Sequence, residues 1–500
     1  MSSVREILGS GLKVAAATVA SLLGWVVASK LLALQFGAAG VGTFGLLRQL
    51  LQNLLVLASL NGQTALVQGV AAAQSSEEKS KYAASVLVIQ AGLCVFIIGT
   101  LLIFAPTLGP LLIAHPEGSS LLRWLAIALV AVVAQSYVYG LLTGNGLLSQ
   151  LVVAQLAGPL SVLLLVFPML WLIRNGHASG YVLMLTGPAA AVAVAGGLAA
   201  CRSRVWPANI RLKVHREHAA RFLSTSSALL VTAGIATGVQ YLQSWSIAKW
   251  LGLEQAGIFW SSWSLSMSYV TLVLGSLGTY YMPKLSQLRS PAERVELMRA
   301  YLRLCMTALP LLVATVVVFK PLIIQIMFSA SLLPALKVMR WMLIGDLFKG
   351  VSWVLAFPML AFAELRTFVL SELLFWVVLA TGCFGWLLAG QNVEGFGAVF
   401  LVAYVLYFAG VLYYARSRHG YHVLRREIAH FGGGLALVLL VSVLCWNDTV
   451  VRLMPVAAFL CAAATFVCLA EPKFTWKTVW SLASRKRADV DVRVAQEEYR

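Results

Sequence analysis

The feature that most constrains this chain is a series of apolar runs, each about 20 residues long or longer, that recurs from one end to the other. About 20 apolar residues are the length that crosses the hydrocarbon of a bilayer as an α-helix. Only 11% of the 500 residues are charged, against about 25% in an ordinary soluble chain. The sequence therefore predicts an all-α integral membrane protein with about fourteen transmembrane helices. The expected spans are 10–36, 41–73, 82–105, 119–143, 147–173, 180–201, 222–250, 255–282, 298–319, 335–362, 367–389, 395–415, 428–446 and 453–470.

The net charge of +18 is spread over short clusters between the apolar runs. Cytoplasmic loops of membrane proteins carry an excess of Lys and Arg. The loops expected on one side of the membrane hold 26 of the 37 basic residues, and those on the other side hold only Arg174, Lys320 and Arg452. An even number of spans with both termini in the cytoplasm fits this alternation. The same placement argues against a nucleic-acid partner.

Motifs of catalytic or nucleotide-binding sites are absent from the sequence: HExxH, a Walker A loop, a GxSxG turn and a GxGxxG after a strand do not occur. The seven cysteines lie in or at the ends of apolar runs without metal-ligand spacing, and the histidines lie in loops or at span ends. We therefore expect no catalytic residue, no metal and no cofactor. Transport would be facilitated, coupled to an ion gradient or driven by a partner.

Two short segments resemble each other at an offset of 215 residues. Lys30 is followed by a glycine-containing turn and then by Gly42-Thr43-Phe44, and Lys249 is followed by a similar turn and by Gly257-Ile258-Phe259. Six expected spans separate the segments, so the two halves would share one orientation, as in a parallel repeat about an axis along the membrane normal. The similarity is short, and chance recurrence of glycine-bearing turns explains it as well.

Parallel halves of six spans indicate a transporter whose path lies between them. No loop is long enough to form a separate folded domain. The domain organisation that follows is a six-helix bundle at 1–201, a basic cytoplasmic linker at 202–221, a second six-helix bundle at 222–420, an extra transmembrane hairpin at 421–470 and a cytoplasmic tail at 471–500.

Ionisable side chains inside a membrane are costly, and they usually face a bundle interior or a wet cavity. Lys30 and Arg48 flank the first turn at similar distances, which places both about 10 Å below the same rim of a helical hairpin. The first six spans carry no acidic residue to pair with them. Both cations either face a cavity for an anion or extend to the headgroups. For Arg48 the cavity is favoured, because Gln49, Gln52 and Asn53 continue a polar patch.

The second half contains the acidic residues that lie clearly within spans. Asp346 and Lys349 are three residues apart on one helical face and can pair, either as structural contacts or as a switch for which a substrate competes. Glu372 is a possible proton site, although a capped carboxylate near the helix end is the favoured interpretation. Lys249 lies nearer the outer interface, where extension to the headgroups is the simple explanation.

The order of several stretches resembles the Wzx-type polysaccharide flippases of the multidrug/oligosaccharidyl-lipid/polysaccharide (MOP) superfamily, and most of all those that translocate enterobacterial common antigen or O-antigen units. The stretches are 29–42 (SKLLALQFGAAGVG), 47–50 (LRQL), 281–288 (YMPKLSQL), 344–349 (IGDLFK), 371–374 (SELL) and 395–398 (GFGA). The resemblance extends to about residue 420. The last two spans and the tail have no counterpart in a twelve-span member of the family.

This resemblance implies two six-helix bundles around a central cavity and transport by alternating access, without catalysis. The implied substrate is an undecaprenyl-pyrophosphate-linked oligosaccharide that moves from the cytoplasmic to the periplasmic leaflet of the bacterial inner membrane. The other implied partners are membrane lipids, a polysaccharide polymerase and a chain-length regulator, and no nucleic acid. The implied substrate-binding residues are Lys30, Arg48, Lys249 and Lys349, and the implied ion-coupling or gating residues are Asp346 and Glu372.

In the mechanism expected from this resemblance, the pyrophosphate is attracted to Arg48, Lys30 and a Lys349 released from Asp346, while the polyprenyl chain stays in lipid. Two other classes remain open, and a structural or assembly-scaffold protein would have the same sequence features. A drug or cation antiporter of the same superfamily would carry membrane carboxylates in its N-terminal half, and here there are none. A membrane-embedded polysaccharide-assembly enzyme would need a sizeable external loop, and the longest expected here has about a dozen residues.

Overall fold

The structure is a computed structural model that describes the backbone of residues 2–206, 214–276, 281–288, 290–362, 364–390, 392–446 and 451–470. All regular structure in these residues is helical. The tail 471–500 and part of the expected linker, 207–213, lie outside the described residues. The helices are α1 (Ser2–Ser59), α2 (Gln63–Ala72), α3 (Ser76–Ile103), α4 (Ala105–Leu112), α5 (Gly118–Gly144), α6 (Leu148–Arg174), α7 (Ser179–Arg202), α8 (Arg216–Trp250), α9 (Leu253–Ser276), α10 (Met282–Gln287), α11 (Pro291–Met327), η2 (Ala330–Leu332), α12 (Ala335–Ala361), α13 (Leu365–Leu388), α14 (Gly395–His419), α15 (Arg425–Leu444) and α16 (Leu453–Ala470).

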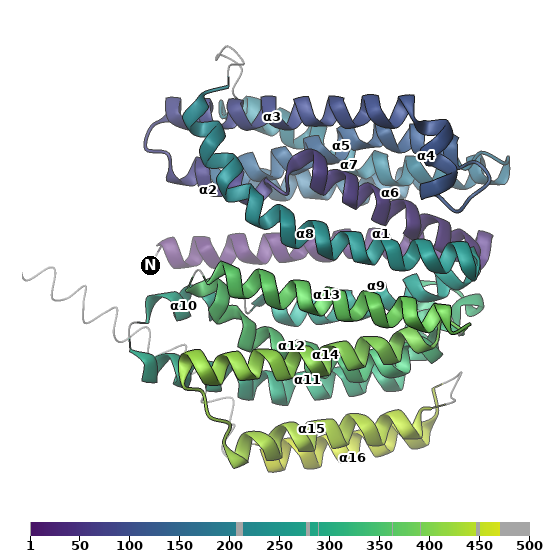
Figure 1. The fold of residues 1–500 in the computed structure, drawn as a ribbon, viewed down its shortest axis with the longest axis vertical. Coiled ribbons are helices and arrows are strands. Elements are labelled where there is room, and N and C mark those ends of the chain that lie inside the picture. The colour runs from purple at the N-terminus through teal and green to yellow at the C-terminus, as the bar shows by residue number, and fades with distance from the viewer. Residues whose placement is uncertain are drawn as a thin grey trace, which may run out of the picture.

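Each of the fourteen expected spans lies within a helix for most of its length. The first falls in α1 and the second in the rest of α1 and in α2. α1 is broken at Gly37 (φ 61°, ψ −156°), a conformation that glycine adopts at little cost. Figure 1 shows the chain reversing direction after the first part of α1. Within the described residues, ten helices are long and apolar enough to cross a membrane, with Leu23–Ala72 counted as one, or eleven with the bent α8. A multi-pass helical membrane protein is thus confirmed, and the number fourteen stays a prediction.

The helices form two groups that lie one beside the other along the longest axis of the molecule (Figure 1). In the first group, the second part of α1 and α2 pack with α3 and α5–α7. In the second group, α9 and α11–α14 pack together, and the hairpin of α15 and α16 lies against α11. The first part of α1 and the long α8 lie between the groups.

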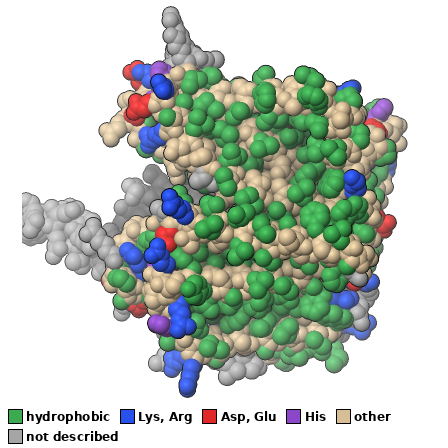
Figure 2. Space-filling view, in the orientation of Figure 1, with side chains coloured by type: hydrophobic (Ala, Val, Ile, Leu, Met, Phe, Trp, Pro, Cys, Tyr) green, Lys and Arg blue, Asp and Glu red, His purple; other side chains and the backbone are tan. Residues whose placement is uncertain are grey.

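The two ends of the bundle differ in charge. We call the end where α2 meets α3, α7 leads to α8 and α14 meets α15 the basic end; it carries residues such as Lys79, Arg202, Arg299, Arg418 and Arg425. The end that carries the Gly37 turn is the opposite end. Figure 2 shows that more Lys and Arg side chains of this face gather at the basic end, and that the surface there is indented between the two groups.

The surface between the two ends is apolar, as the green side chains in Figure 2 show. Large apolar side chains such as Phe96, Leu164 and Leu374 are 70%, 75% and 66% exposed. In water such a surface would be costly, at about 25 cal/mol per Å² of apolar area. Its position along the helix sides, away from both charged ends, fits contact with lipid tails.

The groups meet most closely where α1 crosses α9, at the two glycines of the repeated segment. A Cβ atom on Gly42 would lie 2.0 Å from the carbonyl oxygen of Leu253, and one on Gly257 would lie 1.9 Å from that of Ala38. Only glycine fits at such an approach of two backbones. The contact is reciprocal at an offset of 215 residues, since Ala38 and Gly42 correspond to Leu253 and Gly257. Such reciprocity is what a two-fold axis between the halves requires.

Hydrogen bonds join the groups at the opposite end. The Tyr241 hydroxyl donates to the carbonyl of Leu112 (2.5 Å), and Trp245 Nε1 donates to that of Leu111 (2.8 Å), which connects α8 to the end of α4. Ser329 Oγ donates to the carbonyl of Ala33 (3.3 Å). Together with the glycine crossing, these bonds close the opposite end, while the basic end is indented.

The C-terminal hairpin is held to the second group by a buried lysine. Lys320, in α11, donates from Nζ to the carbonyl of Cys445 (2.9 Å), which ends α15. The last carbonyls of a helix carry partial negative charge and lack partners within the helix, so a cation there is stabilising. This explains how an ammonium that is only 2% exposed is accommodated between apolar helices.

Candidate functional site

A polar cavity of about 360 Å³ lies within the first group. It is lined by α1, α2, α5, α6 and α7, and two of these helices contain prolines at the cavity wall, Pro159 and Pro188. A proline inside a helix removes a hydrogen bond and commonly bends the helix. Gly24 in α1 lets the chain pack closely on Pro159, because a Cβ there would be 2.9 Å from the proline ring. The cavity wall thus includes two prolines at which the hydrogen bonding of α6 and α7 is interrupted.

The polar side chains of the cavity are mostly amides. They comprise one cation and no carboxylate: Arg48, Gln52, Gln63, Gln135, Ser136, Tyr139 and Gln155. The Ser136 hydroxyl approaches Gln63 Oε1 at 3.4 Å, whereas Gln155 Oε1 is buried and has no hydrogen-bond partner among the described residues. An amide both donates and accepts hydrogen bonds, and a buried polar atom without a partner is costly. The lining therefore offers unused hydrogen-bonding capacity to a polar guest.

Arg48 is the charged residue of this cavity. Its guanidinium lies 4.8 Å from the ring centroid of Trp25, on the first part of α1, and 6.0 Å from that of Trp260, on α9 of the second group. No acidic side chain lies within ion-pair distance of it in the described part of the chain. Aromatic faces hold a guanidinium while its N–H donors remain directed along its edge. Such an arginine is suited to bind a carboxylate or phosphate with two parallel hydrogen bonds.

The expected neighbours of Arg48 lie in different places. Gln52 lines the cavity, one helical turn after Arg48. Asn53 instead connects the groups: it donates to the carbonyl of Thr237 on α8 (3.0 Å) and accepts from the Thr237 hydroxyl (3.0 Å). Gln49 is buried, and its amide has no partner within the described residues. The polar patch predicted from sequence is therefore divided between the cavity and the α1–α8 contact.

Two expected substrate-binding lysines lie at the opposite end and do not line this cavity. Lys30 donates from Nζ to the carbonyl of Gln325 in the last turn of α11, so it connects the first group to the second. Lys249 is exposed, and its ammonium lies 4.7 Å from the ring of Trp245. The hairpin geometry predicted Lys30 and Arg48 at one depth, but the structure directs Lys30 toward a helix end and Arg48 into the cavity.

Asp346 and Lys349 form the expected pair inside the second group. Both side chains are 0% exposed, and Asp346 Oδ1 lies 3.6 Å from Lys349 Nζ. The carboxylate also accepts hydrogen bonds from Ser266 (2.8 and 2.9 Å) and Tyr269 (2.6 Å). Lys349 further contacts Met267 Sδ at 3.1 Å and faces aromatic rings. In this conformation the pair is enclosed, and its charges and hydrogen bonds have partners. It does not line the cavity that contains Arg48.

A set of substitutions separates a structural from a binding role for this pair. We expect Asp346→Ala to lower the free energy of unfolding by about 3–5 kcal/mol, because it leaves the Lys349 charge buried without its counter-ion. The double variant Asp346→Asn/Lys349→Met should recover most of the loss, since it removes both charges. Thermal unfolding in detergent measures both.

The control is Lys337→Ala, which removes the exposed Lys337–Glu394 pair (2.9 Å). This loss is expected to lower the free energy of unfolding by less than about 1 kcal/mol. An Asp346→Ala protein as stable as the native one would contradict this account.

Glu372 lies half-buried on α13. Its carboxylate accepts hydrogen bonds from the hydroxyl of Tyr407 on α14 (2.9 Å) and from Trp376 Nε1, one turn further along α13 (3.3 Å). No basic residue pairs with it among the residues that the structure describes. The carboxylate is thus oriented by neutral donors and has no counter-ion, so a proton is the simplest way to neutralise it.

Sequence analysis did not single out Trp25, Gln63, Gln135, Gln155 or Trp260. The available signal was the presence of glutamines within apolar spans, together with Gly158-Pro159 and Gly187-Pro188, at which the sequence predicts kinks. Polar residues in a membrane helix usually face the interior of the bundle. The pattern indicated an interior position for each glutamine, but not that four of them meet around one arginine. Among the described residues no group of His, Cys, Asp and Glu is arranged to hold a metal ion.

Comparison with known sequences gives a family and two curated relatives. A family model described as "Polysaccharide biosynthesis protein" matches residues 56–337. The chain is 24% identical over 409 residues to a protein named lipid III flippase from Escherichia coli (strain K12), and equally to the one from Shigella flexneri. In each case the alignment covers 79% of this chain and 94% of the relative.

Comparison with solved structures gives the same fold at low sequence identity. The lipid II flippase MurJ in an inward closed conformation aligns with a TM-score of 0.62 and 12% identity, over 93% of this chain and 99% of its own. An inward-facing multidrug resistance transporter of the MATE family, a member of the MOP superfamily, aligns with a TM-score of 0.68 and 14% identity, over 81% of this chain and 94% of its own. Both similarities concern the fold, and both kinds of transporter share it.

Proposed function

The chain belongs to the polysaccharide biosynthesis protein family and has the fold of the MOP superfamily, and from this we propose that it is a flippase for lipid-linked oligosaccharides. The substrate would be an undecaprenyl-pyrophosphate-linked repeat unit of O-antigen or of a related surface polysaccharide. It would move from the cytoplasmic to the periplasmic leaflet of the bacterial inner membrane by alternating access. The relatives named lipid III flippase support this substrate class.

One observation carries the proposal: the cavity of the first group holds an arginine without a counter-ion and has no carboxylate in its lining. An anionic head would provide the charge that Arg48 lacks, and the amides around it would bind the hydroxyl and acetamido groups of sugars. At about 360 Å³ the cavity is near the lower limit of known ligand pockets. It would admit part of the head, while the polyprenyl chain stays in lipid.

The orientation of the protein in the membrane, and with it the direction of transport, follows from the distribution of Lys and Arg. Because Lys and Arg favour cytoplasmic loops, the basic end would face the cytoplasm, with both termini on that side. The indentation at the basic end (Figure 2) would admit the substrate head, and the contacts at the opposite end would prevent leakage. Rocking of the groups about the α1–α9 crossing would then open the opposite end. A polymerase and a chain-length regulator would act on the product.

The antiporter alternative shares the fold, as the similarity to MATE transporters shows. A cation antiporter needs a negative group at its binding site, and the cavity of the first group has none. Reconstitution decides between the two. In proteoliposomes, the flippase is expected to expose a fluorescent lipid-linked oligosaccharide to a leaflet-selective quencher without added drug. Drug-dependent proton release with no movement of the lipid would support the antiporter.

Glu372 is the proposed coupling residue, because its carboxylate has neutral donors and no counter-ion in the described residues. We expect Glu372→Gln to remove the acceleration that an imposed pH gradient gives, while the rate without a gradient changes less than about threefold, since the amide keeps a hydrogen-bond acceptor for Tyr407. Initial rates in proteoliposomes with and without a gradient measure this. A Glu372→Gln protein that still responds fully to the gradient would assign coupling elsewhere.

A further inference from the structure

The two groups are related by the 215-residue offset, but they are not equivalent where they meet. One helical turn after the Gly42–Gly257 crossing, the first group has Gly45 and the second has Trp260. The Trp260 ring lies directly over Gly45, where a Cβ would be 2.5 Å from its Cγ. One further turn along, the first group has Arg48 and the second has Trp263.

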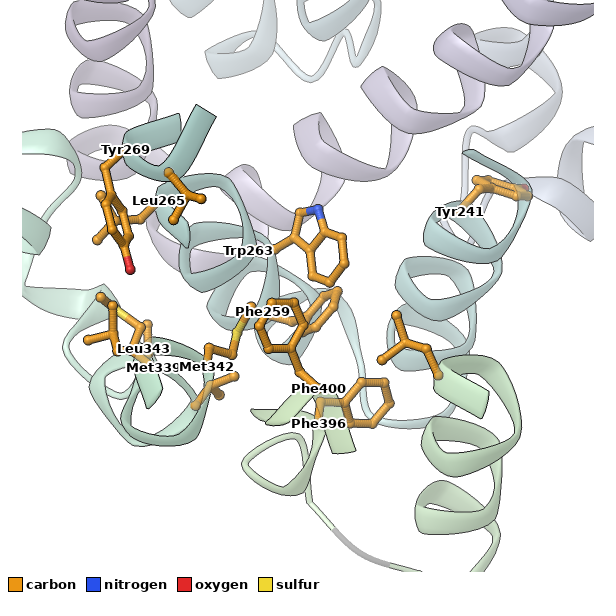
Figure 3. Close-up of a cluster of buried hydrophobic side chains, with 14 of the residues drawn as sticks. Tyr241, Phe259, Trp263, Leu265, Tyr269, Met339, Met342, Leu343, Phe396 and Phe400 are labelled. Atoms are coloured by element: carbon orange, nitrogen blue, oxygen red, sulfur yellow. The ribbon is translucent and has the colours of Figure 1, made fainter. Parts of the chain in front are cut away.

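Because of these differences, aromatic side chains fill the space in the second group, whereas the space in the first group stays open. Trp263 packs into an aromatic cluster of the second group, 5.8 Å from Phe259 and 5.7 Å from Phe400 between ring centroids. Figure 3 shows these side chains together with Phe396, from α9 and α14. Arg48, at the corresponding position, lines a cavity. The polar space is therefore lined by the first group, and aromatic side chains fill the corresponding position of the second group.

Trp260 is the residue of α9 that approaches Arg48. Its ring centroid lies 6.0 Å from the guanidinium, near the limit at which a cation still interacts with an aromatic face. Trp25 makes the corresponding contact at 4.8 Å from within the first half of the chain. The Trp260 contact exists only because Gly45 has no side chain and because the glycine crossing brings α1 and α9 together.

We propose that Trp260 is a positioning residue for anion binding, which holds the Arg48 guanidinium ready for the substrate only while α1 and α9 are crossed at Gly42 and Gly257. The proposal rests on the flippase function described above. When the groups separate at the opposite end, Trp260 moves away from Arg48 with α9. Arg48 then loses one of its two aromatic supports, and its affinity for the anionic head falls. Binding at the basic end and release at the opposite end would thus follow from one contact between the groups.

The test measures affinity rather than transport. The probe is undecaprenyl pyrophosphate, titrated into the purified full-length protein in detergent. We expect Trp260→Leu to weaken binding about tenfold, since a partly desolvated cation–π contact is lost, and Trp260→Phe to stay within about threefold of the native protein. Gly45→Ala adds a Cβ that would displace the Trp260 ring from its position over residue 45, and it should weaken binding as Trp260→Leu does. Trp446→Leu is the matched control, because it removes a similar tryptophan–cation contact, with Arg340 at 4.7 Å, whose residues do not line the cavity.

The outcomes separate the two proposals. Weakening by Trp260→Leu and Gly45→Ala, with rescue by phenylalanine and no effect of Trp446→Leu, supports the positioning role. A native protein that binds the probe and a Trp260→Leu protein that binds it equally well would overturn the role of Trp260 and leave the flippase function intact. Equal weakening by phenylalanine and leucine would also overturn it, because the aromatic ring would then not matter. A native protein that does not bind the probe would refute the proposed function, and the inference with it.

Discussion

Arg48→Ala is expected to lower translocation of the lipid-linked oligosaccharide by about two orders of magnitude, because loss of a charge-assisted pair with the anionic head costs about 3 kcal/mol. In cells, surface display of the polysaccharide should fall to background. Arg48→Lys should retain part of the activity, since it keeps the charge but loses the planar fork of donors. The cavity lining contains no other cation that could replace it.

The control for Arg48 must be another cation that the resemblance had also implicated. Lys249→Ala serves, because Lys249 is exposed at the opposite end and contacts Trp245 instead of the cavity. It should leave display within about twofold of the native level, as most exposed substitutions change little. The amount of each variant in the membrane is compared by immunoblot. Undiminished surface display of the polysaccharide with Arg48→Ala would show that Arg48 is not part of the substrate-binding site.

The second large effect concerns the crossing of the two groups. Gly257→Val should abolish transport, because a Cβ at this position would lie 1.9 Å from the carbonyl oxygen of Ala38 and the backbones must separate. The opposite end could then not close. A cysteine introduced at Ser329, which is buried in the native protein, should react with a membrane-impermeant thiol reagent from the periplasmic side in the Gly257→Val background only.

The matched control is Gly99→Val, at a helical glycine with no other atom within 4 Å of the Cβ that it would gain. Transport and protection of the cysteine at position 329 should both remain native with this variant. Retained transport in Gly257→Val, with position 329 still protected, would show that the glycine crossing is not needed for closure.

Much of the fold could be predicted because the bilayer imposes span length and loop charge. All fourteen expected spans lie in helices for most of their length, since a run of apolar residues of that length has few alternatives in lipid. The break at Gly37 lies between the first two expected spans. The short α4 and α10 were not predicted as separate helices, because neither is long enough to give an apolar run of its own.

The site was predictable only as far as local helix geometry extends. Arg48, Leu51, Gln52 and Leu55 follow helical spacing and all line the cavity. Gln49 and Asn53 lie on other faces of the same helix, which the linear patch concealed. The position of Lys30 was beyond such reasoning, because its partner Gln325 is 295 residues away. Depth in the membrane follows from sequence, but the direction of a side chain depends on which helices pack around it.

The location of the cavity was likewise a matter of tertiary packing. The resemblance implied a central cavity between two bundles. The structure has an indentation between the groups at the basic end (Figure 2) and a polar cavity, lined by helices of the first group, that contains Arg48. Trp263, the counterpart of Arg48, occupies the corresponding position in the aromatic cluster of the second group (Figure 3). The sequence indicated this difference between the two groups only in that one position holds an arginine and its counterpart holds a tryptophan.

Photocrosslinking tests most directly the claim that the cavity of the first group receives the substrate head. A benzophenone amino acid is placed on α6 either at Gln155, which lines the cavity, or at Leu164, which is 75% exposed on the lipid-facing side, and a lipid-linked oligosaccharide with radiolabelled sugars is added. We predict a labelled adduct at position 155 that excess unlabelled substrate and Arg48→Ala both abolish, whereas any labelling at position 164, where only the polyprenyl chain is in reach, is unchanged by Arg48→Ala. Labelling at 164 alone, or labelling at 155 that is indifferent to Arg48, would contradict the account.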